Sequence, residues 1–311
     1  MHEQVARVLY YLQIHLLYAS TVWFAAWIVT AIRSGSATTK YWIWVATSLN
    51  FILPLAAVLD KVGAAHLSWA RPLGVFGDVG VRISQNVLVA AVLSVIWLVG
   101  ATLMFARLWL RLRVERRDAR AASPPCAPGN ARSFLVDGVP VCFANNTQVP
   151  AVHGVLRPHI SLPQGLDRLL SAQELNAVLA HELTHATRRD NLICLLHQFV
   201  LCCLWFHPLV WITGSRLALY RELSCDEPVI QSARGRELIS ALAKLAHPER
   251  GFLLEATASS FLGHRLARLA AHPGRGHRAA SALLAVLFSA VLVGSIFETI
   301  AHTACCFIGG K

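Results

Sequence analysis

Long uncharged, apolar stretches alternate with shorter charged segments along most of this chain. Four of these stretches have about the length that a helix needs to cross a bilayer, and they cover residues 8–32, 41–59, 83–106 and 279–297. The pattern predicts a mainly α membrane protein with four transmembrane helices. A fifth uncharged stretch, 191–215, is as long as the first, and its role depends on the chemistry of the residues around it.

Composition and charge agree with a membrane protein. Hydrophobic residues make up 55% of the 311 residues and charged residues only 14%, whereas about a quarter of the residues are charged in a typical soluble domain. The net charge is +11, but the arginines flank apolar stretches, so we attribute them to membrane topology. We therefore expect a lipid bilayer as a partner and no direct contact with nucleic acid.

The orientation in the membrane follows from a cluster of arginines. Positive residues collect on the cytoplasmic side of membrane helices. Six arginines follow the third apolar stretch, which places its end in the cytoplasm and both termini outside: Arg107, Arg111, Arg113, Arg116, Arg117 and Arg120. We expect three transmembrane helices in residues 1–110, a cytoplasmic domain at 111–278, and a fourth transmembrane helix with a short tail at 279–311.

The segment inserted between the third and fourth spans has mixed α and β character. A linker rich in proline and glycine is expected at 124–129. Asp137-Gly138 lies between two apolar runs, which predicts a β-hairpin, although Pro140 weakens the second strand. Residues 149–163 predict one or two further short strands, and helical periodicity begins after Ser171. The segment is therefore predicted to be an α+β domain.

The sequence HELTH at 181–185 carries the strongest chemical signal. Two histidines four residues apart lie on one face of a helix, where both imidazoles can bind one zinc ion. Glu182 can then act as a general base on a water molecule. Ser171 and Glu174 form a capping-box pattern at the start of the same helix. We therefore predict His181 and His185 as zinc ligands, with Glu182 as the catalytic base.

A zinc site needs a further protein ligand, and Glu222 is the best candidate. If 191–215 crossed the membrane, roughly 30 Å of hydrocarbon would separate His185 from Glu222. We therefore predict that 191–215 forms an apolar helical hairpin that breaks near Pro208 and returns Glu222 to the histidines. Asp226 lies one helical turn after Glu222, where its carboxylate can accept a hydrogen bond from a ligating imidazole.

These residues resemble a known family. The segments HELTH at 181–185, RRDN at 188–191, WFHPLVW at 205–211 and RELSCDE at 221–227 are similar to the BlaR/MecR-type integral-membrane zinc metallopeptidases, which are antirepressor regulators that sense β-lactams. The upstream GVLRPHISLP at 154–163 also resembles their pattern. The resemblance implies a gluzincin-like fold with His181, His185 and Glu222 as ligands and Glu182 as base. It also implies a bacterial inner membrane protein and a substrate such as a BlaI-like winged-helix repressor.

One departure from that family changes the expected signal. The receptors carry a penicillin-binding sensor domain after the fourth span, and we expect this chain to lack it, so the activating signal stays open. The first hypothesis is a zinc endopeptidase that cleaves a cytoplasmic regulatory protein, possibly as a homodimer. The alternatives are a membrane quality-control protease of the HtpX type and a non-catalytic scaffold whose structural zinc takes Cys225 as a fourth ligand.

Other residues near the motif have more ordinary interpretations. Asp190 either pairs with a neighbouring arginine or belongs to the site. Peptidases with the HExxH motif often bind the substrate along an edge strand beside the metal helix, and we assign that role to 155–162. Three side chains could donate to an oxyanion, although we favour a structural role for each: His197, His207 and Tyr220. Cys225 is expected to pack in the interior.

Overall fold

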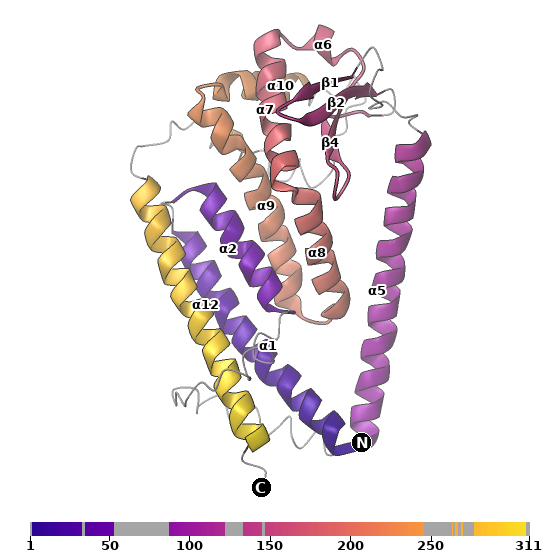
Figure 1. Cartoon of the computed structure of the whole chain (residues 1–311), viewed down its shortest axis with the longest axis vertical. Coiled ribbons are helices and arrows are strands. Elements are labelled where there is room, and N and C mark those ends of the chain that lie inside the picture. The colour runs from indigo at the N-terminus through magenta and orange to yellow at the C-terminus, as the bar shows by residue number, and fades with distance from the viewer. Residues whose placement is uncertain are drawn as a thin grey trace.

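The fold comes from a computed structural model that describes residues 2–32, 35–52, 87–121, 133–144, 147–245 and 277–308, with single residues between 263 and 269. The helices are α1 (His2–Ala31), α2 (Ala37–Asn50), α5 (Val87–Ala121), α6 (Leu166–Leu169), α7 (Ala172–Arg188), α8 (Asp190–Cys203), α9 (Pro208–Gln231), α10 (Gly235–Leu245) and α12 (His277–Ile308). The strands are β1 (Ser133–Val136), β2 (Val139–Ala144), β3 (Ala151–His153) and β4 (His159–Pro163). The described chain is thus mainly helical with one small sheet (Figure 1).

Several expected features lie outside the described residues. They are the second part of the expected span 41–59, the loop at 60–82 and the linker at 124–129. Helix α2 is described as far as Asn50. The first residues of α1 and the last turn of α12 lie at the end of the molecule opposite the sheet (Figure 1).

The sheet forms where the turn chemistry predicts it. Asp137 and Gly138 both have positive φ angles, 47° and 78°, and join β1 to β2 as an antiparallel hairpin. Pro140 pairs with Leu135 of β1, and the pairing of β2 with β4 begins only at Val141. The order β1-β2-β4-β3 is mixed, because β2 and β4 are parallel while the other pairs are antiparallel.

This order corrects the strand expected at the edge. Residues 155–158 are not in a strand, and β4, which begins at His159, has partners on both sides. The interpretation of 155–162 as an edge strand was therefore wrong. Among the described strands, β3 is the edge strand nearer to the metal helix in sequence, and it packs against α7.

Helix α5 has the properties of a membrane-spanning helix. Among the described residues, its stretch Leu88–Val114 is the one helix long and apolar enough to cross a membrane, and only 11% of its most apolar window is buried. A core helix of a soluble protein would be mostly buried, so this exposure favours a lipid-facing surface. Shorter apolar helices cover His15–Ala31, Asp190–Cys203 and Ala279–Gly294. The four-span layout and its orientation stay predictions.

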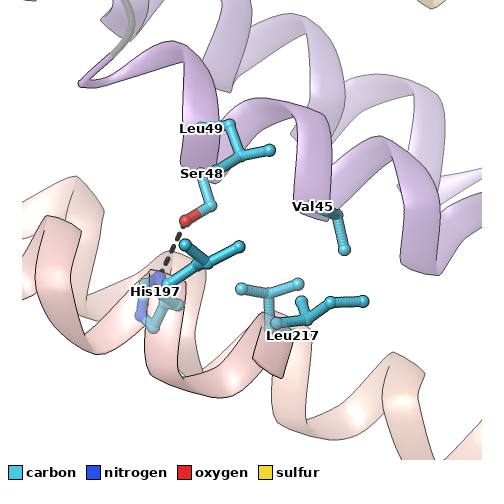
Figure 2. A pocket seen from close by; sticks show the side chains of 7 residues that line it. Val45, Ser48, Leu49, His197 and Leu217 are labelled. Atoms are coloured by element: carbon cyan, nitrogen blue, oxygen red, sulfur yellow. Dashed lines mark hydrogen bonds between the residues drawn. The ribbon is translucent and has the colours of Figure 1, made fainter. Parts of the chain in front are cut away.

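The apolar stretch 191–215 contains a reversal of the chain. Helix α8 ends at Cys203, and α9 begins at Pro208, which occupies the first helical turn, where its missing N–H costs nothing. The two helices run side by side from a turn at their lower end (Figure 1). Both pack against α2, where the buried Ser48 and His197 side chains hydrogen-bond at 2.9 Å beside a small pocket lined by apolar residues (Figure 2).

Two hydrophobic cores meet along α9. One core joins α1, α2, α8 and the first part of α9, including Leu217 and Leu223. The other joins the sheet, α7, α10 and the last part of α9, including Val229. On α9, the first group ends at Leu223 and the second begins at Val229, so Glu222 and Asp226 lie where the helix passes from one core to the other.

Candidate metal centre

Helix α7 carries the two histidines, and its ends are set by local chemistry. The Ser171 hydroxyl accepts a hydrogen bond from the Glu174 backbone N–H at 3.2 Å, and the Glu174 carboxylate accepts one from the Ser171 N–H at 2.7 Å. This is the predicted capping box. The helix ends where Arg189 adopts a left-handed conformation with φ 57° and ψ 47°, and α8 starts at the next residue. This tight corner returns Asp190 to His185.

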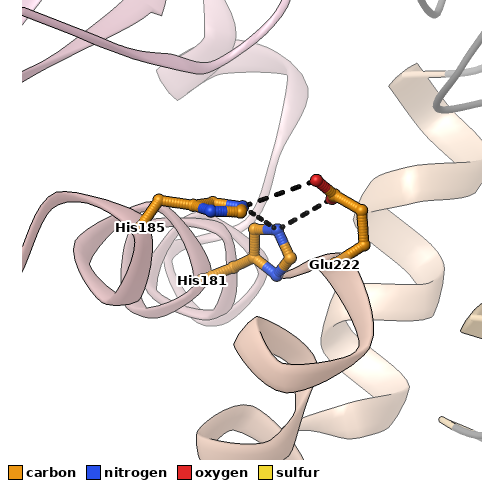
Figure 3. A group of neighbouring side chains, drawn as sticks. All are labelled: His181, His185 and Glu222. Carbon is orange, nitrogen blue, oxygen red and sulfur yellow. Dashed lines mark hydrogen bonds and ion pairs between the residues drawn. The ribbon is translucent and has the colours of Figure 1, made fainter. Parts of the chain in front are cut away.

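The structure brings the three predicted ligands together. The Nε2 atoms of His181 and His185 lie 3.2 Å apart. Glu222 lies across from them on α9, with one carboxylate oxygen 3.6 Å from His181 Nε2 and the other 3.8 Å from His185 Nε2. Figure 3 shows the two rings and the carboxylate pointing toward a common centre.

This donor set fits a zinc ion. Zinc binds imidazole nitrogen and carboxylate oxygen at about 2.0–2.2 Å in a tetrahedron, so neighbouring ligand atoms should be about 3.4 Å apart. The three observed separations of 3.2, 3.6 and 3.8 Å lie close to that value. When each Nδ1 donates its hydrogen to an aspartate, both Nε2 atoms present lone pairs to each other, and a cation between them removes the repulsion.

His181 is held from behind by Asp226 and by an arginine that the sequence did not indicate. Asp226 is fully buried, and its carboxylate lies 2.9 Å from His181 Nδ1. Arg265 donates two hydrogen bonds to the same carboxylate, from Nε at 3.0 Å and from Nη2 at 2.9 Å. Its Nη1 atom also lies 3.5 Å from Glu222. Arg265 thus fixes Asp226 and adds a positive charge beside the donor cluster.

His185 is held in the same manner by a second aspartate and a second arginine. The Asp190 carboxylate lies 2.6 Å from His185 Nδ1, and Arg188 donates to both of its oxygens at 2.6 Å. Burial raises the pKa of Asp190, but the hydrogen bonds from Arg188 and His185 outweigh it and lower the pKa to about 2. Both alternatives considered for Asp190 therefore hold: it pairs with an arginine and it contacts a predicted ligand.

The electrostatics of the cluster favour ionised carboxylates around a positive centre. Burial raises the pKa of Glu222, but its hydrogen bond with His181 and the charges of His185 and Arg221 hold it well below the usual 4.5. Burial and Arg265 lower the pKa of His181, yet hydrogen bonds with Asp226 and Glu222 raise it to about 9. The carboxylates thus favour a positive charge between the two imidazoles.

The remaining candidate residues are not members of the cluster formed by His181, His185 and Glu222. Glu182 follows His181 on α7 and is half-buried. Cys225 Sγ lies 3.3 Å from His185 Nδ1, which is the ring nitrogen facing away from the donor cluster, and burial raises the pKa of its thiol. Tyr220 donates to the Thr30 carbonyl at 3.2 Å, and His197 hydrogen-bonds Ser48. These contacts support the structural interpretation of Tyr220 and His197.

Two functional candidates were missed by the sequence reasoning, and for different reasons. Arg188 was considered only as one of two arginines that could pair with Asp190, although its two-residue spacing from Asp190 was visible. Arg265 lies outside every motif on which the sequence prediction was based. It lies 39 residues beyond Asp226, so no local spacing could have indicated their contact.

Comparisons with known proteins identify the family of the chain. Residues 11–266 match the family described as BlaR1 peptidase M56. The chain is 40% identical over 87 residues to the regulatory protein BlaR1 of Bacillus licheniformis, a match that covers 27% of this chain and 14% of that protein. It is 24% identical over 106 residues to the methicillin resistance mecR1 protein of Staphylococcus aureus, covering 34% of this chain and 18% of the relative. The matched stretches are thus small parts of these curated relatives.

Proposed function

The chain belongs to the BlaR1 peptidase M56 family, and from this premise we propose that it is a membrane-embedded zinc endopeptidase of the regulatory type. The observation that carries the proposal is the convergence of His181, His185 and Glu222, with each imidazole held from behind by its own aspartate. The proposed ligands are these three residues, and the proposed base is Glu182. This combination is the HExxH-plus-glutamate arrangement of gluzincins.

The residues of the chain divide the chemical work. A bound zinc ion supplies a Lewis acid that polarises the substrate carbonyl and lowers the pKa of a water molecule toward about 7. Glu182 accepts a proton from the attacking water and later donates it to the leaving amide nitrogen. Asp226 and Asp190 hold the two imidazoles so that their Nε2 atoms face the centre. Arg265 balances the charge of the carboxylates.

The proposed setting is the bacterial inner membrane with the metal centre on the cytoplasmic side. The exposed apolar surface of α5 supports membrane insertion, and the arginines that follow it support the orientation. The substrate is then a cytoplasmic protein, and the name of the B. licheniformis relative, a regulatory protein, favours a transcriptional repressor of the BlaI-like kind. A homodimer is compatible with this proposal, which does not depend on it.

The alternatives receive less support. Membership of the BlaR1 peptidase M56 family favours the regulatory type over the HtpX type. A closed structural site would need Cys225 as a fourth ligand, but its sulfur lies against the Nδ1 atom of His185, whereas the donor cluster forms at Nε2. The described cluster supplies three protein ligands, and a site with three protein ligands is typical of catalytic zinc rather than of a closed structural site.

Replacing Glu182 with Gln tests the proposal. The variant should keep one zinc per chain and lose proteolysis, because the base is removed while every proposed ligand stays. Glu237→Gln, on α10, is the matched control with the same chemical change outside the donor cluster. Zinc content is measured by elemental analysis of the purified full-length chain, and proteolysis by comparing the proteomes of cells that express each form.

The outcomes separate the hypotheses. A cytoplasmic protein that accumulates with Glu182→Gln, but not with Glu237→Gln, identifies the substrate. An accumulating transcriptional regulator supports the regulatory type, whereas many misfolded membrane proteins support the quality-control type. Unchanged proteolysis by Glu182→Gln would defeat the assigned role of the base, and a wild-type chain that binds no zinc would defeat the metal site itself.

A further inference from the structure

A tyrosine of helix α2 reaches the metal centre through one intermediate side chain. The Tyr41 hydroxyl donates a hydrogen bond of 2.9 Å to one oxygen of Asp190, whose other oxygen lies 2.6 Å from His185 Nδ1. Both Tyr41 and Asp190 are buried, with relative exposures of 1% and 2%. Buried hydrogen bonds that share a carboxylate fix its plane, because every oxygen direction is already used. The hydroxyl of α2 therefore helps to determine where His185 points.

Arg188 strengthens the same connection. Its guanidinium lies 4.1 Å above the Tyr41 ring and also donates to both oxygens of Asp190. The aromatic ring supports the arginine by a cation–π contact, and the hydroxyl supports the aspartate directly. Tyr41 thus contacts both Asp190, which hydrogen-bonds to His185 Nδ1, and Arg188, which hydrogen-bonds to Asp190. A displacement of Tyr41 therefore disturbs both residues.

We propose that Tyr41 is a positioning residue of the metal centre, which it reaches through Asp190 and His185, and that helix α2 is thereby coupled to metal binding. This inference rests on the proposed function, because it requires that His185 bind the metal. Outer partners of ligating histidines fix the ring orientation and typically change metal affinity by roughly 10- to 100-fold. Tyr41 acts one step further out, so its contribution is smaller.

An independent contact joins the start of α2 to α9, next to the aspartate that contacts His181. The Glu227 carboxylate accepts hydrogen bonds from the Thr38 backbone N–H at 3.1 Å and from its hydroxyl at 2.7 Å, and it also contacts the Ala37 N–H. Glu227 directly follows Asp226, which holds His181. Helix α2 is therefore attached near both histidines, and a movement of α2 relative to α8 and α9 changes both attachments.

Coupling of this kind is reciprocal. If the position of α2 changes the affinity for the metal, the metal must stabilise the docked position of α2 by the same free energy. Because α2 also packs against α8 and α9, its position links the metal centre to the apolar hairpin.

The test compares two tyrosine-to-phenylalanine substitutions in the full-length chain in detergent micelles. Tyr41→Phe should weaken zinc binding by about 3- to 10-fold in competition with a chelator, which is below the range for a direct outer partner. Tyr220→Phe is the matched control, because Tyr220 is also buried and its hydroxyl also bridges two helices, by donating to Thr30. It should lose similar stability in the metal-free state and keep the wild-type zinc affinity.

A second measurement shows whether Tyr41 acts through Asp190. In an Asp190→Asn background, Tyr41→Phe should cause no further loss of zinc affinity, whereas independent effects would add. Suppose that Glu222→Ala loses zinc but Tyr41→Phe binds zinc as tightly as the wild type does. That result would overturn the inference and leave the proposed function intact. If Glu222→Ala and His185→Ala both still bind zinc, the proposed function is defeated instead.

The wild-type chain gives an answer that does not depend on a variant folding. Zinc should slow the hydrogen–deuterium exchange of the peptide that contains 37–50, because a filled site stabilises the docked helix. The same peptide in Glu222→Ala should show no response to zinc. Identical exchange of the wild-type peptide with and without zinc would contradict the coupling.

Discussion

His181 and His185 point their Nε2 atoms at each other across 3.2 Å, and each ring is held from behind by a different aspartate and arginine. The two supports come from distant parts of the chain, since Arg188 is the last residue of α7 while Arg265 lies after α10. Such doubled support fixes both tautomers before a metal arrives, so little reorganisation is needed on binding.

Glu222→Ala should weaken zinc binding by more than about 100-fold, because removing a direct ligand costs more than removing an outer partner. Chelator competition on the purified chain measures the change. Glu237→Ala, which removes a carboxylate of α10, serves as the control and should bind as the wild type does. Unchanged affinity in Glu222→Ala would show that the third ligand is a different residue.

Arg265→Lys should weaken zinc binding by about 10-fold, because it keeps the positive charge but loses the two parallel hydrogen bonds to Asp226. Lysine is chosen because it keeps the positive charge. A neutral substitute would also remove the repulsion between the guanidinium and the metal, and this second change would oppose the first. Arg234→Lys, at an exposed position, is the control. Equal affinity for Arg265→Lys and the wild type would mean that Asp226 keeps its position without the arginine.

Cys225→Ser should leave the visible spectrum of the cobalt-substituted protein unchanged, because the sulfur contacts His185 on the side away from the donor cluster. The wild-type spectrum should lack the intense near-ultraviolet band that thiolate ligation to cobalt produces. A band that is present in the wild type and lost in Cys225→Ser would support the scaffold hypothesis with a structural zinc.

Glu174 should make folding stability depend on pH in the acidic range. Hydrogen bonds from Lys244, Ser240 and the Ser171 N–H outweigh burial and lower its pKa from the usual 4.5 to about 2. The ionised carboxylate therefore contributes stability that is complete above pH 4.5 and is lost as the pH falls through about 2. The free energy of unfolding of the wild type should exceed that of Glu174→Gln at about pH 6, and this difference should shrink by about pH 3.

Chemical unfolding followed by circular dichroism at several pH values measures this difference. Lys244→Met removes the cation that contacts the same carboxylate at 2.6 Å, and it should reproduce part of the effect. A wild-type advantage over Glu174→Gln that stays constant from neutral to acidic pH would show that the capping carboxylate has an ordinary pKa in the folded chain.

Both ends of the apolar hairpin should lie on the cytoplasmic side. In a cysteine-free background, Thr187→Cys and Arg234→Cys place exposed thiols before α8 and after α9. A membrane-impermeant thiol reagent should label neither thiol in intact cells and both after lysis. Labelling of only one of them in intact cells would put His185 and Glu222 on opposite sides of the bilayer and exclude a shared metal.

Local chemistry was enough to predict the parts of the site that lie on one helix. The Ser171–Glu174 capping box fixes where α7 begins, and the four-residue spacing then fixes the relative position of His181 and His185. Asp137-Gly138 likewise predicted the β1–β2 turn, because both residues tolerate positive φ angles. A distance argument predicted that the chain folds back and places Glu222 beside the histidines. The reversal between α8 and α9 is the feature that does so.

Long-range contacts were outside the reach of such reasoning. Period-two patterns identify strands but do not say which strand lies between which, so the edge position was assigned to 155–162 instead of β3. The contacts of Asp226 with Arg265 and of Asp190 with Tyr41 join residues 39 and 149 positions apart. The packing of α2 against α8 and α9 brings Tyr41 to Asp190, and the chain after α10 brings Arg265 to Asp226.

Helix α9 contributes side chains to both hydrophobic cores. The number of residues between its two core-packing parts is therefore fixed. One inserted residue between Leu217 and Val229 would rotate everything beyond it by about 100°. Either the apolar side chains would leave one core, or the two carboxylates would turn away from the histidines. Insertions and deletions among natural relatives should therefore collect in the segments between helices, while the spacing within α9 stays unchanged over evolution.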